Sequence, residues 1–447
     1  MHRRQLMVAG GASALGLWVQ ACGGGTGGAA SVVDAESSEG SDSGGAGGTT
    51  PPAVPPGGTS GRVVIVGGGM GGATLAKYLR LWGGAAIDVT LVEREPQYTS
   101  CILSSLVLSG QRTLDSLKYR HDALKSRYGV KVVVGEATAV DPVARSVRLA
   151  SGTVLGADRL VLAPGIDFDA TPGLDNPDAM PHAWKAGPQT VLLAQRLRAM
   201  RAGGTVVLTV PPVPYRCPPG PYERACLIAD WLRINKPGSK LLVLDANPDI
   251  VVEKDNFSRA FFDLHAGVID YRAGVVIDHV DAASNTLFTN GGAVAADVVN
   301  LIPPQRAGGI VAAAGLANAG GGRFAAVDVL SYESTAASGV HVIGDASATT
   351  QPKAGHIANQ EAKVCADAIV RLFGGGSPDP APVTTSACYS TVTMSQASWL
   401  HAVFQYDAAS RAMAAVPAAF GASASWSSGN FRQMGTWFNA LMADTFA

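Results

Sequence analysis

Short apolar runs alternate with helical patterns along the central part of the chain. The run Val63–Val66 is β-branched and aliphatic throughout, as in a parallel strand that is buried on both faces. A glycine-rich turn and a helical stretch follow it, and Ile87–Val92 is predicted to be the next strand. This order of strand, helix and strand predicts an α/β fold.

The glycine-rich turn has the spacing of a dinucleotide-binding fingerprint. Gly67 allows the tight turn, Gly69 lets the backbone approach a pyrophosphate, and Gly72 lets the helix pack on the strand. The N-terminus of the helix offers free N–H groups to the phosphates. Glu93 follows the second strand, about 20 residues after the last glycine, where a ribose-binding carboxylate is expected. The alternative is a glycine-rich turn of an ordinary α/β domain.

A second α/β unit begins with the predicted strands Thr205–Val210 and Lys240–Asp245. The turn after its first strand is filled with proline, from Pro211 to Pro221, and contains Cys217. Proline has no N–H and its ring blocks close approach, so this turn cannot hold a pyrophosphate. The pattern therefore argues against NADH or NADPH as the electron donor and suggests that the turn presents Cys217.

Further strands are predicted at 131–140, 158–163, 297–304 and 339–343, with a hairpin around Ser151-Gly152 before the second of these. The strand 158–163 ends at Pro164-Gly165, and the strand 339–343 ends at Gly344-Asp345. A helix is predicted from about Ala358 to Phe373. The last segment, 381–447, is rich in aromatic residues and is predicted to be a small domain with a partner-binding face, or one that simply packs on the body.

The N-terminus has the features of an export signal. Arg3-Arg4 precede a modest apolar stretch, which suggests the twin-arginine route. Val19–Cys22 resembles a lipoprotein cleavage box, so Cys22 is a candidate lipid anchor; the alternative is a plain signal with an incidental cysteine. Residues 23–60 are mostly Gly, Ser, Ala, Thr and Pro and are predicted to form a flexible linker.

Composition narrows the class of protein. Hydrophobic residues make up 47% of the 447 residues and charged ones 15%, enough for a large core. The net charge of -1 gives no reason to expect nucleic acid as a partner. No Cys-x-x-Cys-His motif occurs, so no c-type haem is expected on this chain, and no His/Cys spacing suggests a metal site.

Several segments carry a specific resemblance to one family. They are the glycine-turn segment, His182–Gly187, Arg216–Ala225, Val299–Gly308, Gly339–Ala346, Ala387–Ser390 and the final Asp-Thr-Phe. In these segments the chain resembles the flavoprotein subunit of flavocytochrome c sulfide dehydrogenase, within the wider sulfide:quinone reductase and disulfide-reductase-like group. The resemblance spans roughly residues 62–447, and Arg-Cys-Pro-Pro-Gly-Pro-Tyr-Glu-Arg is its most discriminating run.

The resemblance implies FAD, sulfide oxidation and a cytochrome c subunit as electron acceptor. It implies that Cys101, in the loop Tyr98–Ser104, carries a covalent bond to the flavin. The predicted cofactor-binding residues are Gly67, Gly69, Gly71, Gly72, Glu93, Arg94, Cys101, Ala137, Ala163, Gly165, Gly344, Asp345 and Lys353. The predicted catalytic residues are Cys217, Ser347 and Lys353.

Ser347 departs from the family pattern. The family has a redox disulfide whose first cysteine matches Cys217 and whose second stands at position 347. Three alternatives follow from the serine: Cys217 acts alone through a persulfide, the substrate has changed, or Cys217 pairs with another cysteine, namely Cys226, Cys365 or Cys388. Arg216 and Arg224 are expected to lower the pKa of Cys217, unless they form surface ion pairs. Lys353 is expected to neutralise the reduced flavin, and His356 to move protons or simply to form a hydrogen bond.

The sequence thus predicts an α/β protein with two Rossmann-like dinucleotide-binding domains and a small C-terminal α+β domain. The expected parts are a signal peptide at 1–22, a linker at 23–60, an FAD-binding domain at 61–170 and 301–380, a second Rossmann-like domain without an NAD site at 171–300, and a C-terminal domain at 381–447. The leading functional hypothesis is a periplasmic FAD-dependent sulfide dehydrogenase. The alternatives are a quinone-reducing enzyme and a non-catalytic flavoprotein subunit.

Overall fold

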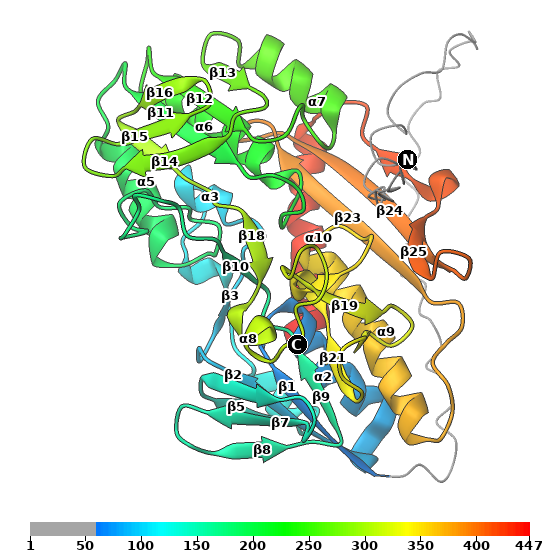
Figure 1. The fold of residues 1–447 in the computed structure, drawn as a ribbon. Helices are drawn as coiled ribbons and strands as arrows, with labels where there is room; N and C mark the ends of the chain where they lie inside the picture. Colours follow the sequence, from blue (N-terminus) through cyan, green and yellow to red (C-terminus); the bar gives the residue numbers. More distant parts are fainter. Residues whose placement is uncertain (1–59) are drawn as a thin grey trace, which may run out of the picture.

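The computed structural model describes residues 60–447 of the chain. The predicted export signal, Cys22 and nearly all of the predicted linker lie outside the described residues. One mixed sheet with a parallel core, one parallel sheet and a C-terminal antiparallel sheet form the body of the protein, and Figure 1 shows them from one side. The predicted α/β fold class with two Rossmann-like units is confirmed.

The first domain is built on an eight-stranded sheet with the order β22-β19-β20-β21-β9-β1-β2-β5. Its core strands β21, β9, β1, β2 and β5 are all parallel to their neighbours. The strand bounds are β1 Gly61–Val66, β2 Ile87–Glu93, β5 Lys131–Val134, β9 Arg159–Leu162, β19 Ala325–Asp328, β20 Glu333–Ser334, β21 Val340–Val342 and β22 Ser347–Ala348. The sheet therefore combines strands from before and after the second domain.

Helices α2 (Met70–Gly83) and α9 (Gly355–Phe373) pack together against this sheet. Both helices direct apolar side chains into the core that also contains Val63 and Ile65 of β1. α9 starts three residues earlier than predicted. Shorter elements complete this part of the domain: β3 Tyr98–Thr99, α3 Ser105–Leu108, β4 Lys118–Tyr119, α4 Asp122–Ser126 and α8 Gly309–Ala313.

One predicted strand of this domain is wrong. Residues 131–140 form two strands in different sheets, β5 and β6 (Ala137–Asp141). The division lies at Gly135, whose N–H donates the last bond of the β2–β5 ladder to the carbonyl of Glu93 (2.8 Å), and β6 then pairs with β7 (Ser146–Leu149) in another sheet. The predicted hairpin is confirmed: β7 pairs antiparallel with β8 (Val154–Gly156), and β6 extends it to three strands.

The second domain repeats this plan. Its parallel sheet has the order β13-β12-β11-β17, with bounds β11 Thr205–Val210, β12 Lys240–Asp245, β13 Ile269–Arg272 and β17 Val298–Asn300. An antiparallel sheet of β14 Ile277–Asp281, β15 Thr286–Thr289 and β16 Gly292–Ala295 precedes its last strand. The helices are α5 Pro188–Ala199, α6 Gly220–Asn235 and α7 Lys254–Arg259. β10 (Ile166–Phe168) and β18 (Gln305–Ala307) pair where the chain leaves and re-enters the first domain.

The C-terminal segment contacts both domains. Its sheet consists of β23 Val383–Thr391, β24 Ala397–Asp407, β25 Ala412–Ala415 and β26 Gly421–Ala422, followed by α10 Ser428–Phe446. β23 contacts α6 of the second domain and α9 of the first, and Figure 1 shows β23 and β24 in orange beside both. Phe438 and Phe446 of α10 are buried in the core of the first domain. Packing on the body, one of the two predicted roles of this segment, is therefore observed.

Candidate active site

The predicted cofactor residues of the first domain lie at one edge of its sheet. Gly67 follows β1, Ala163 follows β9, Gly344 follows β21, and Glu93 ends β2. Because these four strands are parallel, their carboxyl ends meet at the same edge. Ligands of open α/β sheets bind at this edge.

The glycine turn is closed tightly against the neighbouring strand. Gly67 has φ +103°, and a Cβ there would lie 2.3 Å from the carbonyl oxygen of Ala163. A Cβ at Gly72 would lie 1.8 Å from the carbonyl oxygen of Gly67. Gly71 faces the side chain of Ile343. Gly67 and Gly72 therefore allow a turn that packs more closely than a Cβ would permit.

Glu93 points back to the glycine turn. Its carboxylate accepts hydrogen bonds from the N–H groups of Gly68 (2.5 Å) and Glu95 (3.0 Å), one on each oxygen. Each carboxylate oxygen retains capacity for another donor such as a ribose hydroxyl. Arg94 is exposed and pairs with Glu95 (3.7 Å). Ala137 begins β6, two residues after the turn that bonds to the Glu93 carbonyl.

Two residues that the sequence reasoning missed surround the glycine turn. Buried His121 donates its Nε2–H to the Gly68 carbonyl (2.8 Å), since a carbonyl can only accept. The ring of Tyr98 lies 3.4 Å from the Cβ position of Gly69 and stacks on Phe446 with 5.2 Å between ring centroids. Both come from the loop region 98–121, which has no periodic pattern that marks a site.

Arg216 joins the two halves of the site. Burial acts to lower the pKa of its guanidinium, but electrostatic interactions with Cys101, Asp345 and Tyr98 outweigh burial and raise the pKa. Its backbone N–H donates to Gln305 Oε1 (2.8 Å), and its guanidinium donates to the Trp184 carbonyl. The structure thus brings the predicted residues Cys101, Asp345 and Cys217 around one cation.

Polar atoms without a protein partner point to a polar ligand at this place. Within residues 60–447, Asp345 Oδ1, Trp184 Nε1 and Gln305 Nε2 are buried and have no hydrogen-bond partner. All three belong to residues bonded to, or within electrostatic range of, Arg216. Buried polar atoms are normally satisfied, so these fit a bound group with both donors and acceptors. Together with the glycine turn, this donor and acceptor set fits FAD.

Lys353, Ser347 and Glu361 form a buried layer next to Asp345. Lys353 Nζ donates to the carbonyls of Asp345 (2.9 Å) and Ser347 (2.7 Å), and burial lowers its pKa to about 8. The Ser347 hydroxyl donates to the Gly344 carbonyl (2.8 Å). Glu361 accepts from the Gly344 N–H (2.6 Å), and burial raises its pKa to about 8. The sequence signal for Glu361 is its place one turn from the buried residues Ile357 and Cys365 of α9.

Cys217 lies in a left-handed turn just before α6. Its φ is +58°, a conformation that costs a residue other than glycine about 1–3 kcal/mol and that clusters at functional sites. Its N–H donates to the Lys353 carbonyl (2.7 Å), and its carbonyl accepts from the Gly220 N–H (2.8 Å). The first bond holds the strained turn against the Lys353 segment, and the second closes the turn at the start of α6.

The prediction that the pKa of Cys217 is lowered is wrong. Burial raises the pKa of its thiol, Cys388 and Glu223 raise it further, and Arg216 opposes them without prevailing. The alternative of surface ion pairs is also wrong. Arg224 is 1% exposed, donates to the carbonyls of His182 and Ala183, to Asn300 and to Ser105, and lies 4.7 Å from the Trp184 ring centroid.

His356 is held in its neutral form. Burial lowers its pKa to about 4, and its Nδ1 accepts a hydrogen bond from the N–H of Ala387 (3.0 Å). The two predicted site residues Lys353 and His356 therefore connect to different elements: the first to the Cys217 turn and the second to β23.

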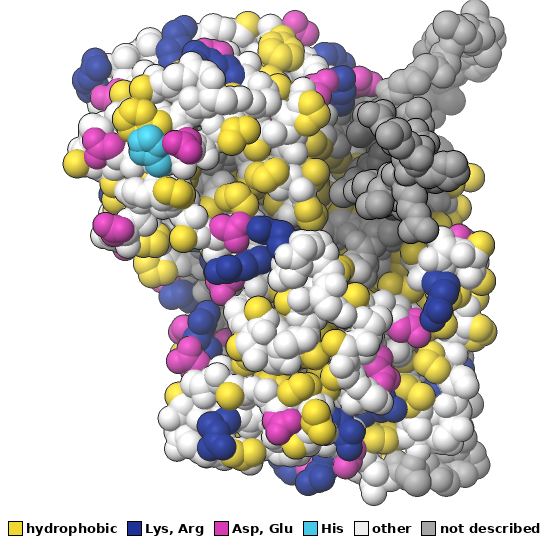
Figure 2. All heavy atoms as spheres, viewed as in Figure 1, with side chains coloured by type: hydrophobic (Ala, Val, Ile, Leu, Met, Phe, Trp, Pro, Cys, Tyr) yellow, Lys and Arg dark blue, Asp and Glu magenta, His cyan; other side chains and the backbone are white. Residues whose placement is uncertain are grey.

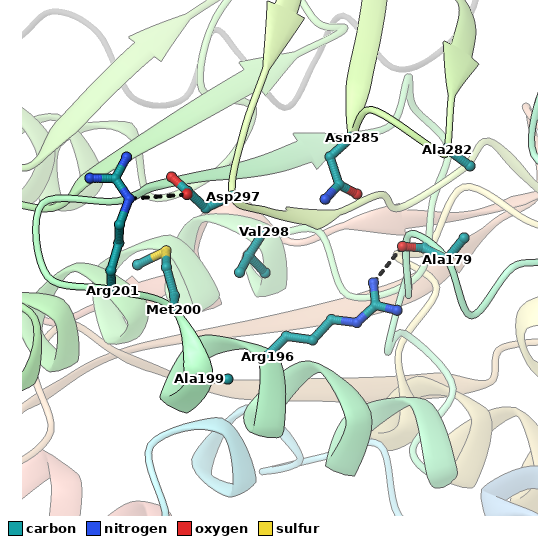
Figure 3. Close-up of a pocket in the computed structure, with 9 residues that line it drawn as sticks. All are labelled: Ala179, Arg196, Ala199, Met200, Arg201, Ala282, Asn285, Asp297 and Val298. Carbon is teal, nitrogen blue, oxygen red and sulfur yellow. Dashed lines mark hydrogen bonds and ion pairs between the residues drawn. The ribbon is translucent and has the colours of Figure 1, made fainter.

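A separate cavity of about 570 Å³ lies in the second domain, between the end of α5 and the turn that joins β14 to β15. Figure 3 shows Arg201 paired with Asp297 and Arg196 donating to the Ala179 carbonyl at its wall. Asp297 precedes β17, so this cavity is at the amino ends of the strands, opposite the edge that binds ligands in such sheets.

The surface adds little to the site. Figure 2 shows acidic and basic side chains interspersed over one face of the molecule. Across residues 60–447, no helix has the length and apolar character that a membrane crossing requires. The same residues contain no cluster of three or more His, Cys, Asp or Glu that would hold a metal ion.

The fold and the site define a flavin-dependent oxidoreductase with two dinucleotide-type domains. Residues 61–198 match the family model described as pyridine nucleotide-disulphide oxidoreductase. More specifically, residues 190–303 match the central region of the sulfide dehydrogenase (flavocytochrome c) flavoprotein chain, and residues 380–446 match the flavin-binding region of flavocytochrome c sulphide dehydrogenase. The chain belongs to the family of the flavocytochrome c sulfide dehydrogenase flavoprotein subunit, and it is an FAD-dependent oxidoreductase of this sulfide-related group.

Solved structures share the fold at low identity. The sulfide:quinone oxidoreductase of Aquifex aeolicus has a TM-score of 0.71 and 18% identity, over 86% of this chain and 91% of that one. An NAD-dependent persulfide reductase from A. fulgidus has a TM-score of 0.57 and 15% identity, over 86% and 77%. A ferredoxin reductase from Rhodopseudomonas palustris has a TM-score of 0.58 and 20% identity, over 78% and 88%.

Proposed function

We propose that this protein oxidises sulfide, or a closely related small reduced sulfur compound, and passes the electrons through FAD to a cytochrome c. The observation that carries the proposal is the convergence of Cys101, Asp345 and Cys217 on Arg216, where the two Rossmann-like domains meet. The family supports a cytochrome partner. The bound flavin would accept an electron pair, which is the redox chemistry that the side chains alone lack.

The chain's own residues would prepare the reaction. Cys217 supplies the sulfur nucleophile, and Arg216 favours its thiolate against the effect of burial. Lys353, with a pKa of about 8, carries a positive charge below that pH and stands beside Asp345. Lys353 can therefore offset the negative charge of a reduced flavin. Asp345 Oδ1 is free to accept a hydrogen bond from the cofactor.

We further propose that Cys101 holds the flavin covalently. Its Sγ is half-buried, accepts a hydrogen bond from the Ala186 N–H (3.4 Å) and lies within electrostatic range of Arg216 and Tyr98. After acid precipitation of the purified protein, the flavin should stay with the pellet, and mass spectrometry should find it on the peptide that contains Cys101. Cys101→Ser should release it, while Cys365→Ser, a buried cysteine of α9, should not. Flavin in the supernatant of the wild type would refute the covalent bond.

The reaction is tested by adding sulfide to the oxidised protein without oxygen. The flavin absorption should bleach in the wild type and persist in Cys217→Ser. Subsequent addition of cytochrome c should restore the oxidised flavin spectrum; restoration by a quinone alone would support the quinone-reducing alternative. Absence of bleaching in the wild type, with bleaching in Ser347→Cys, would identify a non-catalytic subunit.

Export by a twin-arginine signal and lipidation of Cys22 are the remaining parts of the proposal. They are supported by the residue pattern at the N-terminus, which lies outside the described residues. The mature protein should be found in the periplasmic or membrane fraction, and Arg3→Lys with Arg4→Lys should retain it in the cytoplasm. A Cys22→Ser variant that stays membrane-bound would contradict lipidation.

A further inference from the structure

We propose that Cys217 and Cys388 form a redox-active thiol–disulfide pair. Cys388 of β23 is then the second cysteine of the disulfide, a role that Ser347 cannot fill. The inference rests on the proposed role of Cys217 in sulfide oxidation. It concerns a residue that the C-terminal sheet brings to the site from outside both Rossmann-like domains.

Hydrogen bonds hold the two cysteine segments on a common support. The Cys217 N–H donates to the Lys353 carbonyl (2.7 Å). The Ala387 N–H, next to Cys388, donates to His356 Nδ1 (3.0 Å). Lys353 and His356 are three residues apart, so one short segment anchors both cysteine segments.

A second bond joins the same two segments from the other side. The hydroxyl of Thr391, three residues after Cys388 on β23, donates to Glu223 Oε1 (3.1 Å). Glu223 lies in the first turn of α6, which starts three residues after Cys217. The turn before α6 and the strand β23 are therefore held together at two places. The Lys353 segment joins them on one side of the thiols, and the bond from Thr391 to Glu223 joins them on the other.

The two thiols share their surroundings. Both are half-buried and pack against the apolar cluster that contains Tyr215, Tyr222 and Leu400. Burial is the largest cause of the raised pKa of Cys217, Cys388 is the second largest, and Glu223 is the third. The thiols are thus within electrostatic range of each other, and both are free in this structure.

The other candidates for the partner are less suited. Cys226 and Cys365 are fully buried inside α6 and α9. The hydroxyl of Ser347 is engaged with the Gly344 carbonyl (2.8 Å) and cannot form a sulfur–sulfur bond. Cys101 is the proposed flavin attachment site. Among the cysteines in the described part of the chain, Cys388 is partly buried and its segment is bonded to the Lys353 segment. It also lies close enough to Cys217 to raise the pKa of that thiol.

The pair would work as follows. HS⁻ attacks one Sγ of the Cys217–Cys388 disulfide: the bond between the cysteines breaks, a persulfide forms on the attacked cysteine, and the other leaves as a thiolate. A second HS⁻ takes the outer sulfur away as hydrodisulfide, HSS⁻, and leaves a thiol. Re-forming the disulfide from this thiol and thiolate releases two electrons and one proton, which bound FAD would accept. The overall balance is two HS⁻ giving one HSS⁻, one proton and two electrons.

Peptide mapping of the full-length wild-type protein tests the pairing without any activity measurement. The protein is oxidised with diamide, free thiols are alkylated after denaturation without reductant, and the digest is examined by mass spectrometry. We expect a cross-linked peptide pair that contains Cys217 and Cys388 and that dithiothreitol separates. If both cysteines are alkylated, or if either is linked to a different cysteine, the proposal is wrong. Because this measurement uses the wild type, a variant that misfolds does not leave the question open.

Variants separate the pairing from the proposed function. Cys388→Ser should leave Cys217 fully alkylated and slow sulfide-dependent bleaching at least tenfold, while Cys365→Ser should keep both the cross-link and the bleaching rate. A cross-link in the wild type without any sulfide bleaching would uphold the pair and overturn the proposed function. Bleaching at the wild-type rate in Cys388→Ser would overturn the pair and uphold the function.

Discussion

Two buried carboxyl groups around the site have raised pKa values. Glu223 is 9% exposed and Glu361 is 1% exposed. Burial raises the pKa of Glu223 to about 7 and that of Glu361 to about 8. Each therefore retains a proton in the folded protein at a pH where the unfolded chain has released it. Folding takes up protons in this range, which makes stability depend on pH.

Glu223→Gln should remove part of that dependence. A raised folded pKa means that the contribution of Glu223 is fully present below its ordinary value of 4.5 and is lost as pH rises through about 7. Over this window the free energy of unfolding of the wild type should fall by up to about 3 kcal/mol relative to that of the variant, at about 1.4 kcal/mol per pH unit. Thermal midpoints measured from pH 4.5 to 8 should therefore converge at the acid end and separate in favour of the variant toward neutrality. Parallel curves would show that Glu223 does not titrate there.

The glycine turn permits a second substitution test. Gly72→Ala places a Cβ 1.8 Å from the Gly67 carbonyl oxygen, so the helix must move away from the strand. Such overpacking costs about 1–3 kcal/mol, and the shifted turn should also bind less flavin. Gly156→Ala is the matched control, because a Cβ there meets nothing within 4 Å. Equal flavin content and thermal midpoint in both variants would contradict the close packing of this turn.

Individual residues of the site were predictable where a strand end or a motif marks them. Gly67, Glu93, Gly344 and Asp345 follow apolar runs, and parallel strands bring their ends together. The central position of Arg216 was not predictable, because its neighbours Cys101, Trp184, Gln305 and Asp345 come from four separate segments. The pKa of Cys217 was misjudged because sequence adjacency to arginine says nothing about burial.

Among the secondary-structure elements, α10 depends on a buried cation. Lys77 of α2 is 7% exposed, and its Nζ donates to the carbonyls of Ala443 (3.3 Å), Asp444 (2.9 Å) and Ala447 (2.8 Å). These carbonyls belong to the last turn of α10 and to its C-cap residue, where a cation also complements the helix dipole. Lys77 thereby fastens α10 to the first domain.

Lys77→Met should loosen this helix. The variant keeps the apolar stem but leaves the carbonyls without their charged donor, at a cost of about 1–3 kcal/mol. We expect a lower thermal midpoint and faster amide exchange in residues 428–446. Lys131→Met is the control, since Lys131 is 64% exposed in a surface ion pair with Asp88 and should matter little. Unchanged exchange in α10 would show that Lys77 does not hold it.

Strand and helix prediction succeeded or failed for identifiable reasons. The runs at β1, β2, β9, β11 and β12 are apolar enough to identify buried parallel strands. The run 131–140 is equally apolar by composition, yet it divides at Gly135 between two sheets. Long-range strand pairing decides that division, because β5 pairs with β2 while β6 pairs with β7.

On the scale of the entire protein, the C-terminal sheet fastens the second domain through a buried carboxylate. Glu253 Oε1 accepts from the hydroxyl of Ser390 (2.8 Å), and its Oε2 accepts from that of Ser398 (2.6 Å). Both serines are fully buried, and burial raises the pKa of Glu253. The interface between β23, β24 and the second domain therefore contains a polar centre that must remain satisfied.

Ser390→Ala with Ser398→Ala should weaken this interface. Each lost hydrogen bond to the carboxyl group costs about 1–3 kcal/mol because Glu253 stays buried. The double variant should melt at a lower temperature and be cleaved sooner by protease between residues 392 and 397. Ser410→Ala, which removes an exposed turn hydroxyl bonded to Asp407, should change the midpoint very little. Equal protease resistance of the double variant and the wild type would contradict the role of Glu253.

The discontinuous sheet of the first domain sets the order in which the protein can mature. β9 lies between β1 and β21, yet the entire second domain is encoded between β9 and β21. A ribosome that has just translated β9 has delivered the glycine turn and Glu93, but not Asp345 or the Lys353 segment. Capture of the cofactor is therefore a late step of biosynthesis. This step can begin only after the second domain has emerged from the ribosome.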